Sequence, residues 1–489
     1  MTLQQLLRVL REVYDLDPEA QNIHVTRLDM DSRSVREGTL FFCIKGYTVD
    51  GHDYAAQAVA NGAVAIVSER PLSLSVPVVV VRDTKRAMAR LASHFYNEPT
   101  KHLHLIGVTG TNGKTSVSHM LAQLFEDAGK PSGLIGTLYT KIGKETLETA
   151  NTTPESLILQ KRFSTMLERN IETAVMEVSS HALDLGRVHG CDFDVAVFTN
   201  LTRDHLDYHE TMEQYLFAKG LLFSQLGNTY NGKVAVINID DPAAHQLMKM
   251  TAVDVVTYGI DAPAHVTAEE IQVTASGTTF LLCAFGEKVA ITLPLIGRFN
   301  VYNALATTAA ALASGLSLVQ IKQSLPRVSG VAGRFERIDE GQDFTVIVDY
   351  AHTPDSLKNV LMTVQQLTKQ AVTVVIGCGG DRDVTKRPIM GKIATGYATR
   401  AIFTSDNPRT EAPEKILDQI VQGASDSDDT YEVVIDRRMA IRHAISQAKK
   451  GDVIVIAGKG HETYQEIGHE RMYFDDRLEA REAIKEYLK

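Results

Sequence analysis

Residues 102–128 read HLHLIGVTGTNGKTSVSHMLAQLFEDA, and this stretch decides the fold expected for the chain. His102–Val108 is apolar and β-branched enough for a buried strand, and apolar residues then recur at helical spacing from Val117 to Leu124. Between the strand and the helix lies a glycine-rich turn. Backbone N–H groups in such a turn converge on the helix N-terminus, where the helix dipole favours an anion. The stretch therefore predicts a phosphate-binding loop.

The predicted loop departs from the strict phosphate-loop pattern, which needs a glycine five residues before Gly113, where this chain has Val108. We expect Lys114 to reach the outer phosphates and the Thr115 hydroxyl to ligate Mg²⁺. The alternative is an ordinary glycine turn that ends in a surface lysine. Because a strand, Gly-Lys-Thr and a helix occur together, the pattern favours a nucleotide-phosphate site.

Length and composition limit the class of protein. A chain of 489 residues predicts about three domains, and 44% hydrophobic with 22% charged residues is typical of a globular protein. A net charge of −10 argues against a nucleic-acid partner. The cysteines at 43, 191, 283 and 378 are scattered, which indicates reduced thiols in a cytoplasmic protein.

The N-terminus and the hydropathy pattern give no sign of export or membrane insertion. Residues 1–17 are expected to form an amphipathic helix with acidic residues rather than a signal peptide. No apolar run approaches the roughly 18 residues that a membrane-spanning helix needs.

The strand and helix patterns predict an α/β protein with domains at residues 1–98, 99–331 and 332–489. In the first domain, polar loops such as 31–34 and 45–53 suit a ligand with hydroxyls and phosphates, although plain turn residues explain them as well. In the last domain, strands alternate with helices, which predicts a doubly wound, Rossmann-like parallel sheet.

Carboxylate and histidine side chains follow two expected strands of the middle domain. Glu177 lies in the strand expected over 173–178, where a second Mg²⁺ ligand is wanted beside a phosphate loop. A salt-bridged strand end explains Glu177 equally well. His205 lies in NLTRDHLDYH (200–209), after a strand expected over 195–199. No cysteine is near enough in sequence for a structural zinc site, so Mg²⁺ with His205 as one ligand fits better.

Two further features of the middle domain have alternative explanations. Lys219 lies near the buried face of an expected helix, where a lysine either extends its charge to solvent or has a functional role. Asn300 and Asn303 share one face of an alanine-rich helix. Their amides could recognise a purine edge, or one of them could cap the helix.

Polar loops follow the expected strands of the last domain, at the sheet edge where α/β proteins bind ligands. They combine glycines, arginines and carboxylates, which suits a zwitterion because arginine pairs with carboxylate and carboxylate pairs with ammonium. These loops are 349–355, 377–383, 406–409 and 458–462.

The motifs together resemble the Mur ligases over essentially the whole chain. The matching pieces are GTNGKTS, MEVSSHAL, FTNLTRDHLDYH, FAKGLLF, GRFNVYNA, GRFE, DYAHTPDS, GCGGDRD and GKGHE. The resemblance implies three domains and an ADP-forming acid–amino-acid ligase of peptidoglycan precursor synthesis that works through an acyl phosphate. Within the family, DNPR (406–409) favours members that add meso-2,6-diaminopimelate to the D-Glu γ-carboxylate of UDP-N-acetylmuramoyl-L-alanyl-D-glutamate.

The resemblance also implies roles for individual residues. The catalytic set is Lys114, Glu177, His205 and Lys219, and the metal ligands are Thr115, Glu177, His205 and Lys219. Lys219 matches the lysine that the family carbamylates to N6-carboxylysine, an anion that can support a second Mg²⁺. Matches to ATP contacts are Gly110, Thr111, Asn112, Gly113, Lys114, Thr115, Ser116, Asn300, Arg334, Asp349 and His352. Matches to contacts with the UDP-muramoyl dipeptide are Ser32, Asn151, Thr152, Thr153, Ser179 and Arg187.

The matches to diaminopimelate contacts lie on the last domain. They are Arg382, Asp406, Asn407, Pro408, Arg409, Gly458 and Glu462. Diaminopimelate differs from lysine by a second carboxylate, which Arg409 can pair bidentately. A buried arginine that lysine left unpaired would be costly, so we expect rejection of lysine by a factor on the order of 10⁴ or more.

Two other functions remain as alternatives. A folylpolyglutamate synthetase shares the ligase architecture and the phosphate loop, but would lack the first domain and DNPR. A phosphate-loop switch or motor would hydrolyse nucleotide without an acceptor amine. For the ligase we expect a monomer that binds only its small-molecule substrates and Mg²⁺.

Overall fold

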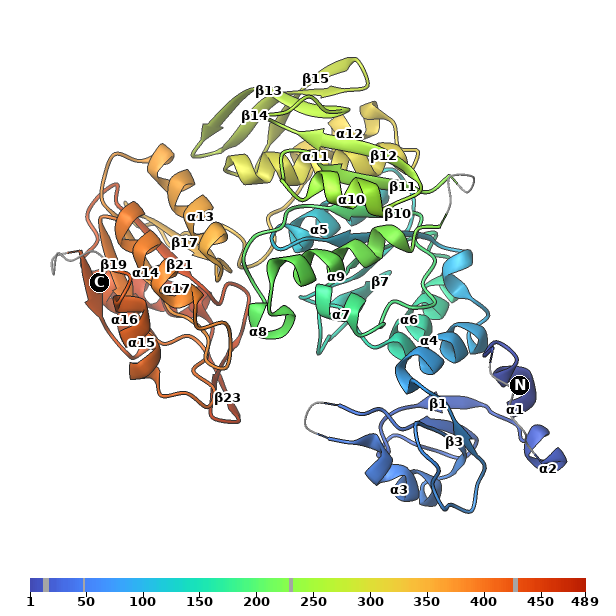
Figure 1. Ribbon diagram of the computed structural model, residues 1–489. Coiled ribbons are helices and arrows are strands. Elements are labelled where there is room, and N and C mark those ends of the chain that lie inside the picture. Colours follow the sequence, from blue (N-terminus) through green and yellow to red (C-terminus); the bar gives the residue numbers. More distant parts are fainter. Residues whose placement is uncertain (12–16, 47–48, 228–231, 425–429) are drawn as a thin grey trace.

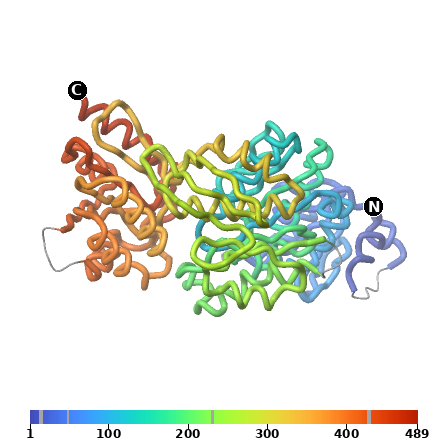
Figure 2. Tube along the Cα trace, turned by 90° about the horizontal axis from the view of Figure 1, so that it is seen from above, coloured from blue at the N-terminus to red at the C-terminus, as the bar shows by residue number. Residues whose placement is uncertain are grey.

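The computed structural model describes residues 1–11, 17–46, 49–227, 232–424 and 430–489, which form three bodies with the central one in the middle (Figures 1 and 2). Residues 12–16 of the expected N-terminal helix and residues 47–48 of the expected polar loop 45–53 lie outside this description. Within the described part of that segment, residues 1–11, the helix is α1 (Leu3–Leu7), and the chain turns directly after it. Among the described residues, no helix combines the length and apolar character that crossing a bilayer requires.

The first body is a small α/β unit, as expected. Its sheet has the order β1-β2-β3-β4, with neighbouring strands parallel. The elements are α1 (Leu3–Leu7), α2 (Pro18–Gln21), β1 (Arg27–Asp29), β2 (Thr39–Phe42), α3 (Ala55–Ala60), β3 (Ala63–Ser68), β4 (Val78–Val80) and α4 (Thr84–Phe95). Helix α4 packs on α6 (Ser156–Glu168) of the central body, and Leu157 of α6 joins the apolar core of the first body.

The central body is built on an eleven-stranded sheet of order β15-β14-β13-β12-β11-β10-β5-β9-β6-β7-β8. Its strands are β5 (His104–Thr109), β6 (Ser132–Ile135), β7 (Thr140–Ile142), β8 (Glu145–Leu147), β9 (Thr173–Glu177), β10 (Val195–Phe198), β11 (Val234–Asn238), β12 (Asp254–Gly259), β13 (Val266–Thr274), β14 (Gly277–Ala284) and β15 (Glu287–Leu293). Its helices besides α6 are α5 (Lys114–Asp127), α7 (Ser180–Asp184), α8 (Leu206–His209), α9 (Met212–Ser224), α10 (Ala244–Met250), α11 (Arg298–Ala313) and α12 (Leu318–Ser324).

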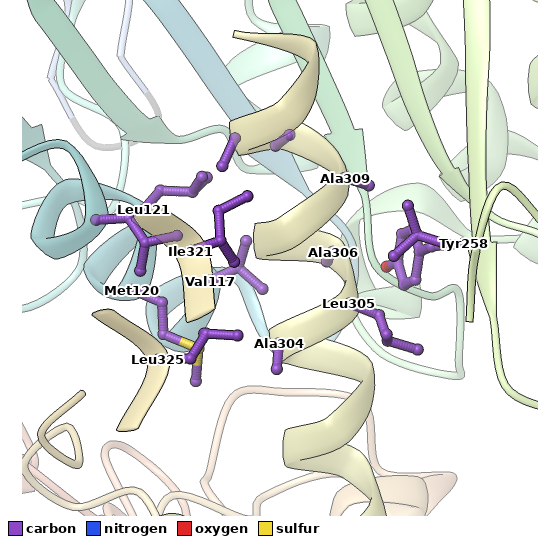
Figure 3. Close-up of a cluster of buried hydrophobic side chains, with 14 of the residues drawn as sticks. Val117, Met120, Leu121, Tyr258, Ala304, Leu305, Ala306, Ala309, Ile321 and Leu325 are labelled. Atoms are coloured by element: carbon purple, nitrogen blue, oxygen red, sulfur yellow. The ribbon is translucent and has the colours of Figure 1, made fainter. Parts of the chain in front are cut away.

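Strand β5 lies inside this sheet, parallel to β10 on one side and β9 on the other. The phosphate loop follows β5, Glu177 is the last residue of β9, and the 200–209 segment follows β10, so they meet at one sheet edge. Helix α5, which follows the loop, packs against α11 and α12 in a core that contains Val117, Leu121 and Ala306 (Figure 3). Small alanines on α11 let the two helices approach closely, and this fixes the loop against the start of α11.

The C-terminal body is a doubly wound sheet of order β16-β17-β21-β18-β19-β20, in which only the β16–β17 pair is antiparallel. Its strands are β16 (Glu336–Ile338), β17 (Thr345–Asp349), β18 (Val372–Ile376), β19 (Arg400–Phe403), β20 (Tyr431–Val433) and β21 (Val453–Ala457). Its helices are α13 (Pro354–Leu367), α14 (Lys386–Tyr397), α15 (Pro413–Val421), α16 (Arg437–Ser446) and α17 (Asp476–Tyr487). Separate apolar cores on the two faces confirm the predicted layering.

A two-stranded hairpin projects from this body, near the β23 label in Figure 1. It consists of β22 (Tyr464–Ile467) and β23 (Glu470–Tyr473), and it directly follows the polar loop 458–462. The sequence analysis did not predict this hairpin.

Candidate active site

The phosphate loop is held in a conformation that only glycine tolerates at two positions. Gly110 has φ +146° and Gly113, the residue before α5, has φ +89°. A Cβ on Gly110 would lie 1.9 Å from Thr199 Oγ1, and one on Gly113 would lie 2.6 Å from Asn303 Oδ1. Thr199, which follows β10, and Asn303 of α11 therefore leave no room for a side chain at these two positions. The loop turns at the N-terminus of α5, as predicted.

Two lysines share one carbonyl of this loop. Lys114 Nζ donates to the carbonyl oxygens of Gly110 at 2.9 Å and Thr111 at 2.8 Å, and Lys219 Nζ donates to Gly110 at 2.8 Å. Lys219 is 1% exposed, so it lies inside the protein and its side chain does not reach solvent. Burial, reinforced by the charge of Lys114, holds the pKa of Lys219 well below its usual range.

Glu177 is fully buried behind the loop, and its carboxylate accepts hydrogen bonds from two threonines. The Thr115 hydroxyl donates to Oε2 at 2.9 Å, the Thr137 N–H to Oε1 at 2.8 Å and the Thr137 hydroxyl to Oε2 at 3.0 Å. No basic partner pairs with Glu177 among the described residues, so the alternative of a salt-bridged strand end is wrong. Thr137 was not singled out from the sequence, because its place beside Glu177 depends on the packing of β6 and β9.

His205 adopts a left-handed conformation with φ +55° and lies beside His181 and Tyr215. Burial lowers the pKa of His205 to about 3, and the neighbouring Asp204 only partly offsets this. The imidazole is therefore neutral at physiological pH, the form that ligates metals.

Asp204, which the sequence analysis passed over, joins the central and C-terminal bodies. Its carboxylate lies 3.5 Å from His352 Nε2 and 3.6 Å from Lys386 Nζ. Burial alone would raise the pKa of Asp204, but the neighbouring His205, His352 and Lys386 side chains hold that pKa well below its usual range. Arg203 reaches the same body, lying 3.6 Å from Asp383.

The residues expected to hold Mg²⁺ are few, and no cluster of three or more His, Cys, Asp or Glu side chains forms a metal site within the described ranges. Mg²⁺ commonly takes one or two protein groups together with substrate phosphates and water. Thr115 and Glu177 are in direct contact beside the phosphate loop, with oxygens of the kind that Mg²⁺ prefers. This donor set fits an ion that is shared with a bound nucleotide.

A cavity of about 390 Å³ lies between the phosphate loop, α11 and the C-terminal body. Of the residues expected to contact ATP, it is lined by Asn112, Gly113, Ser116, Asn300, Arg334 and Asp349. Arg334 Nη2 lies 3.4 Å from Thr115 Oγ1, and Arg334 Nε is buried with no hydrogen-bond partner among the described residues. A cationic group with an unmatched buried donor, placed over a phosphate loop, is suited to an anion.

The first turn of α11 settles the question left open for its two asparagines. Gly297 precedes the helix as its N-cap, so the explanation that one asparagine caps the helix is wrong. Asn300 Nδ2 donates to the Ile296 carbonyl at 2.9 Å, and Asn303 Nδ2 donates to Asn300 Oδ1 at 3.1 Å. Both side chains line the cavity, where their remaining polar atoms can meet a ligand.

Most residues expected to contact the UDP-muramoyl dipeptide lie together behind Glu177. Thr153 donates to the Glu177 carbonyl at 2.8 Å and accepts from the Ser179 N–H at 3.0 Å, while Arg187 Nη1 donates to the Thr153 carbonyl at 3.1 Å. Thr152 joins this group through Thr137, with 3.1 Å between their hydroxyls. Asn151 precedes them on an exposed loop, whereas Ser32 is buried in the first body beside Gln57 and Asn61.

The predicted amino-acid loops meet at one edge of the C-terminal sheet. Lys459 is fully buried and donates to Asn407 Oδ1 at 2.9 Å and to Glu462 Oε2 at 3.0 Å. Asn407 Nδ2 also donates to Glu462 Oε2 at 2.9 Å. A Cβ on Gly458 would lie 2.6 Å from Asp406 Oδ2, so this loop approaches the DNPR loop too closely for a larger residue. Arg382 extends from the neighbouring loop at the surface, where Nη1 donates to the Asp381 carbonyl at 2.9 Å.

Arg409 corrects one assumption of the sequence analysis. Its Nε donates to Glu466 Oε2 at 3.1 Å and its Nη1 donates to the Gly380 carbonyl at 2.7 Å. An amino acid without a second carboxylate therefore does not leave this guanidinium without a partner. The expectation that bound lysine would leave the Arg409 guanidinium without an anion is therefore wrong, because Glu466 already provides one.

Comparison with known proteins follows the same division of the chain. Three family models match: the Mur ligase family catalytic domain at residues 24–96, the Mur ligase middle domain at 108–311, and the Mur ligase glutamate ligase domain at 333–460. A curated relative from Halalkalibacterium halodurans, UDP-N-acetylmuramoyl-L-alanyl-D-glutamate–2,6-diaminopimelate ligase, is 62% identical and covers 97% of this chain and 96% of its own. A Bacillus cereus relative of the same name is 59% identical over 95% of both chains.

A solved structure that carries the same name as these relatives also matches the chain. A structure of a UDP-N-acetylmuramoyl-L-alanyl-D-glutamate–2,6-diaminopimelate ligase is 36% identical, covers both chains fully and gives a TM-score of 0.69. Folylpolyglutamate synthase from Mycobacterium tuberculosis, with ADP and AMPPCP, gives 0.64 at 19% identity over 76% of this chain and 92% of its own, which is a likeness of fold alone. The chain belongs to the Mur ligase family.

Proposed function

We propose that this protein is an ADP-forming ligase that adds meso-2,6-diaminopimelate to the D-Glu γ-carboxylate of UDP-N-acetylmuramoyl-L-alanyl-D-glutamate, in peptidoglycan precursor synthesis. Relatives at 53–62% identity over nearly the whole chain carry the name of this ligase. One observation carries the proposal. The cavity joins the phosphate loop of the central body to Arg334 and Asp349 of the body that bears the DNPR loop.

The reaction has two steps. The γ-carboxylate oxygen attacks the γ-phosphorus of ATP, the bond to the bridging oxygen breaks and ADP leaves. The amine of diaminopimelate then attacks the acyl carbon of the acyl phosphate, and the tetrahedral intermediate expels phosphate. Both steps move negative charge, so fixed donors and cations are the protein's main contribution.

We assign Lys114 and Arg334 to the phosphates. Lys114 now donates to two loop carbonyls, and it would exchange them for phosphate oxygens when nucleotide binds. Thr115 and Glu177 would hold Mg²⁺, which neutralises phosphate charge when it is bound. His205 lies close by and offers a neutral imidazole to a second ion.

We also propose that Lys219 is carbamylated. Carbon dioxide reacts with the neutral amine, and burial favours that form of Lys219. The product carries a carboxylate-like group in a pocket that otherwise holds two amines on one carbonyl. The exchange of an amine for an anion would allow Lys219 to support Mg²⁺, as the resemblance implies.

The remaining assignments follow the sequence analysis. We propose that the dipeptide lies along Thr152, Thr153, Ser179 and Arg187, with its nucleotide toward Ser32. We propose that diaminopimelate lies along Arg382, the DNPR loop and Glu462. We further propose domains at residues 1–98, 99–331 and 332–489, a monomeric state and a cytoplasmic location.

Phosphate release tests the function directly. The assay contains ATP, Mg²⁺, bicarbonate and the UDP-muramoyl dipeptide, with either meso-diaminopimelate or L-lysine. We expect turnover with diaminopimelate and little phosphate release when either the amine or the dipeptide is omitted. Turnover with lysine alone would refute the proposed amino acid, and equal release without any amine would refute the ligase.

A further inference from the structure

Arg409 is held in a strained position by the hairpin that follows the 458–462 loop. It is a non-glycine residue with φ +51°. Its backbone N–H donates to the Glu466 carbonyl at 3.0 Å, and the Gly468 N–H donates to the Arg409 carbonyl at 2.7 Å. The main chain of β22 and of Gly468, which follows it, therefore fixes the backbone of Arg409 independently of any side chain.

The Arg409 side chain has one resident anion. Glu466 Oε2 accepts from Nε at 3.1 Å, and the Gly380 carbonyl accepts from Nη1 at 2.7 Å. Nη2 donates no hydrogen bond to any residue that the structure describes. The two charged side chains are 19% and 21% exposed, so water screens their attraction only in part.

Glu466 is itself well fixed. Its backbone N–H donates to Asn407 Oδ1 at 2.9 Å and its carbonyl accepts from the Arg409 N–H at 3.0 Å, so its main chain is bonded to two residues of the DNPR loop. Arg471, on the partner strand of the hairpin, is a distant second cation, with 4.0 Å between its Nε and Glu466 Oε1.

We propose that Glu466 is the resident counter-ion of Arg409 and sets how strongly the amino-acid site depends on the substrate's second carboxylate. This inference rests on the proposed function. While Glu466 neutralises Arg409, the second carboxylate of diaminopimelate must share the guanidinium with another anion. An amino acid without that carboxylate, such as lysine, leaves Arg409 paired with Glu466. Glu466 thus weakens the binding of diaminopimelate and lowers the penalty on lysine.

Glu466→Gln tests this role, because glutamine keeps an oxygen that can accept from Arg409 Nε while it removes the charge. We expect KM for diaminopimelate to fall about three- to tenfold, the range of a partly exposed ion pair, with kcat within about twofold. We expect the preference for diaminopimelate over lysine to rise by at least the same factor. Loss of a merely structural contact would instead raise KM.

Glu470→Gln is the matched control, because it removes the same charge from an exposed position on the same hairpin. It should leave both kinetic constants unchanged. In an Arg409→Ala background, Glu466→Gln should no longer affect KM for diaminopimelate, because the cation that it neutralises is gone.

The results separate this inference from the function on which it rests. If the wild-type enzyme does not use diaminopimelate, the proposed function fails. If the wild-type enzyme uses it but Glu466→Gln leaves KM unchanged or raises it, the counter-ion role alone is refuted. An equal effect of Glu470→Gln, or an effect that persists without Arg409, would also refute it. A gain in substrate affinity cannot come from misfolding, and thermal unfolding of each variant verifies the fold independently.

Discussion

Arg437 and Asp476 form a buried ion pair that should stabilise the C-terminal body and fix the edge of its sheet. Both side chains are 0% exposed, and they pair bidentately, with Nε–Oδ1 at 2.8 Å and Nη2–Oδ2 at 2.7 Å. Arg437 Nη2 also donates to the Ala457 carbonyl at 2.9 Å, directly before the 458–462 loop.

Arg437→Met would leave the Asp476 carboxylate buried without a cation. Breaking a buried pair in this way costs about 3–5 kcal/mol of unfolding free energy, because the remaining charge has lost both water and partner. For a domain of this size we expect the unfolding midpoint of the C-terminal body to fall by about 10 °C. The KM for diaminopimelate should rise, since the 458–462 loop loses its support.

The double variant Arg437→Met, Asp476→Leu separates lost charge pairing from lost packing. It removes both charges, so it should recover to within about 1–2 kcal/mol of the wild type, the remainder reflecting the hydrogen bond that Arg437 no longer donates to the Ala457 carbonyl. Urea unfolding of the three proteins, followed together with KM, measures this. A loss below about 1 kcal/mol in the single variant, or a double variant no better than the single, would contradict the reasoning.

Four further changes test the site. Arg409→Ala should raise KM for diaminopimelate by about 10²-fold and reduce its preference over lysine, measured by phosphate release; an unchanged preference would exclude Arg409 from specificity. Glu177→Gln should lower kcat by at least about 10²-fold in the same assay at saturating Mg²⁺, with a native-like thermal midpoint, because an amide is a poor Mg²⁺ ligand. Lys219→Met should abolish both turnover and its dependence on added bicarbonate, and mass spectrometry of the wild type should detect one added CO₂. Burial lowers the pKa of His209 to about 4 from 6.5, so its protonation favours the unfolded state as the pH falls between those values; this residue should contribute about 2 kcal/mol to the stability lost from pH 7 to pH 5, and urea unfolding of His209→Gln should show a loss smaller by that amount than the wild type.

Local sequence rules predicted the parts of the fold that depend on neighbouring residues. The strand, glycine turn and helix around Lys114 follow from apolar spacing and from two glycines, and the structure confirms them. The alternating C-terminal pattern likewise predicted the doubly wound parallel sheet, which the structure confirms. Strand β16 escaped prediction, since three residues that join a sheet as an antiparallel edge have no distinct pattern of their own.

Contacts between the bodies could not be predicted from the sequence, for a different reason. Asp204 contacts its chain neighbour His205 at 3.4 Å, but its other partners, His352 and Lys386, are brought to it by the fold from the C-terminal body. His352 lies 3.5 Å from the Asp204 carboxylate and does not line the cavity, so its expected contact with ATP stays a prediction. The docking of two sheets decides which groups meet, and no local spacing encodes that docking.

The case of Arg409 shows how such a contact changes a functional argument. From the sequence, DNPR offers one arginine whose charge demands a carboxylate, and the predicted discrimination against lysine rests on leaving that charge unpaired. Glu466 is separated from Arg409 by 57 positions and reaches it only because β22 returns beside the DNPR loop. Once the fold supplies that anion, the arginine still favours a second carboxylate, but the free energy of discrimination is a difference between two paired states. Specificity then depends on the hairpin as much as on the motif, and a variant of the hairpin can change it while DNPR stays intact.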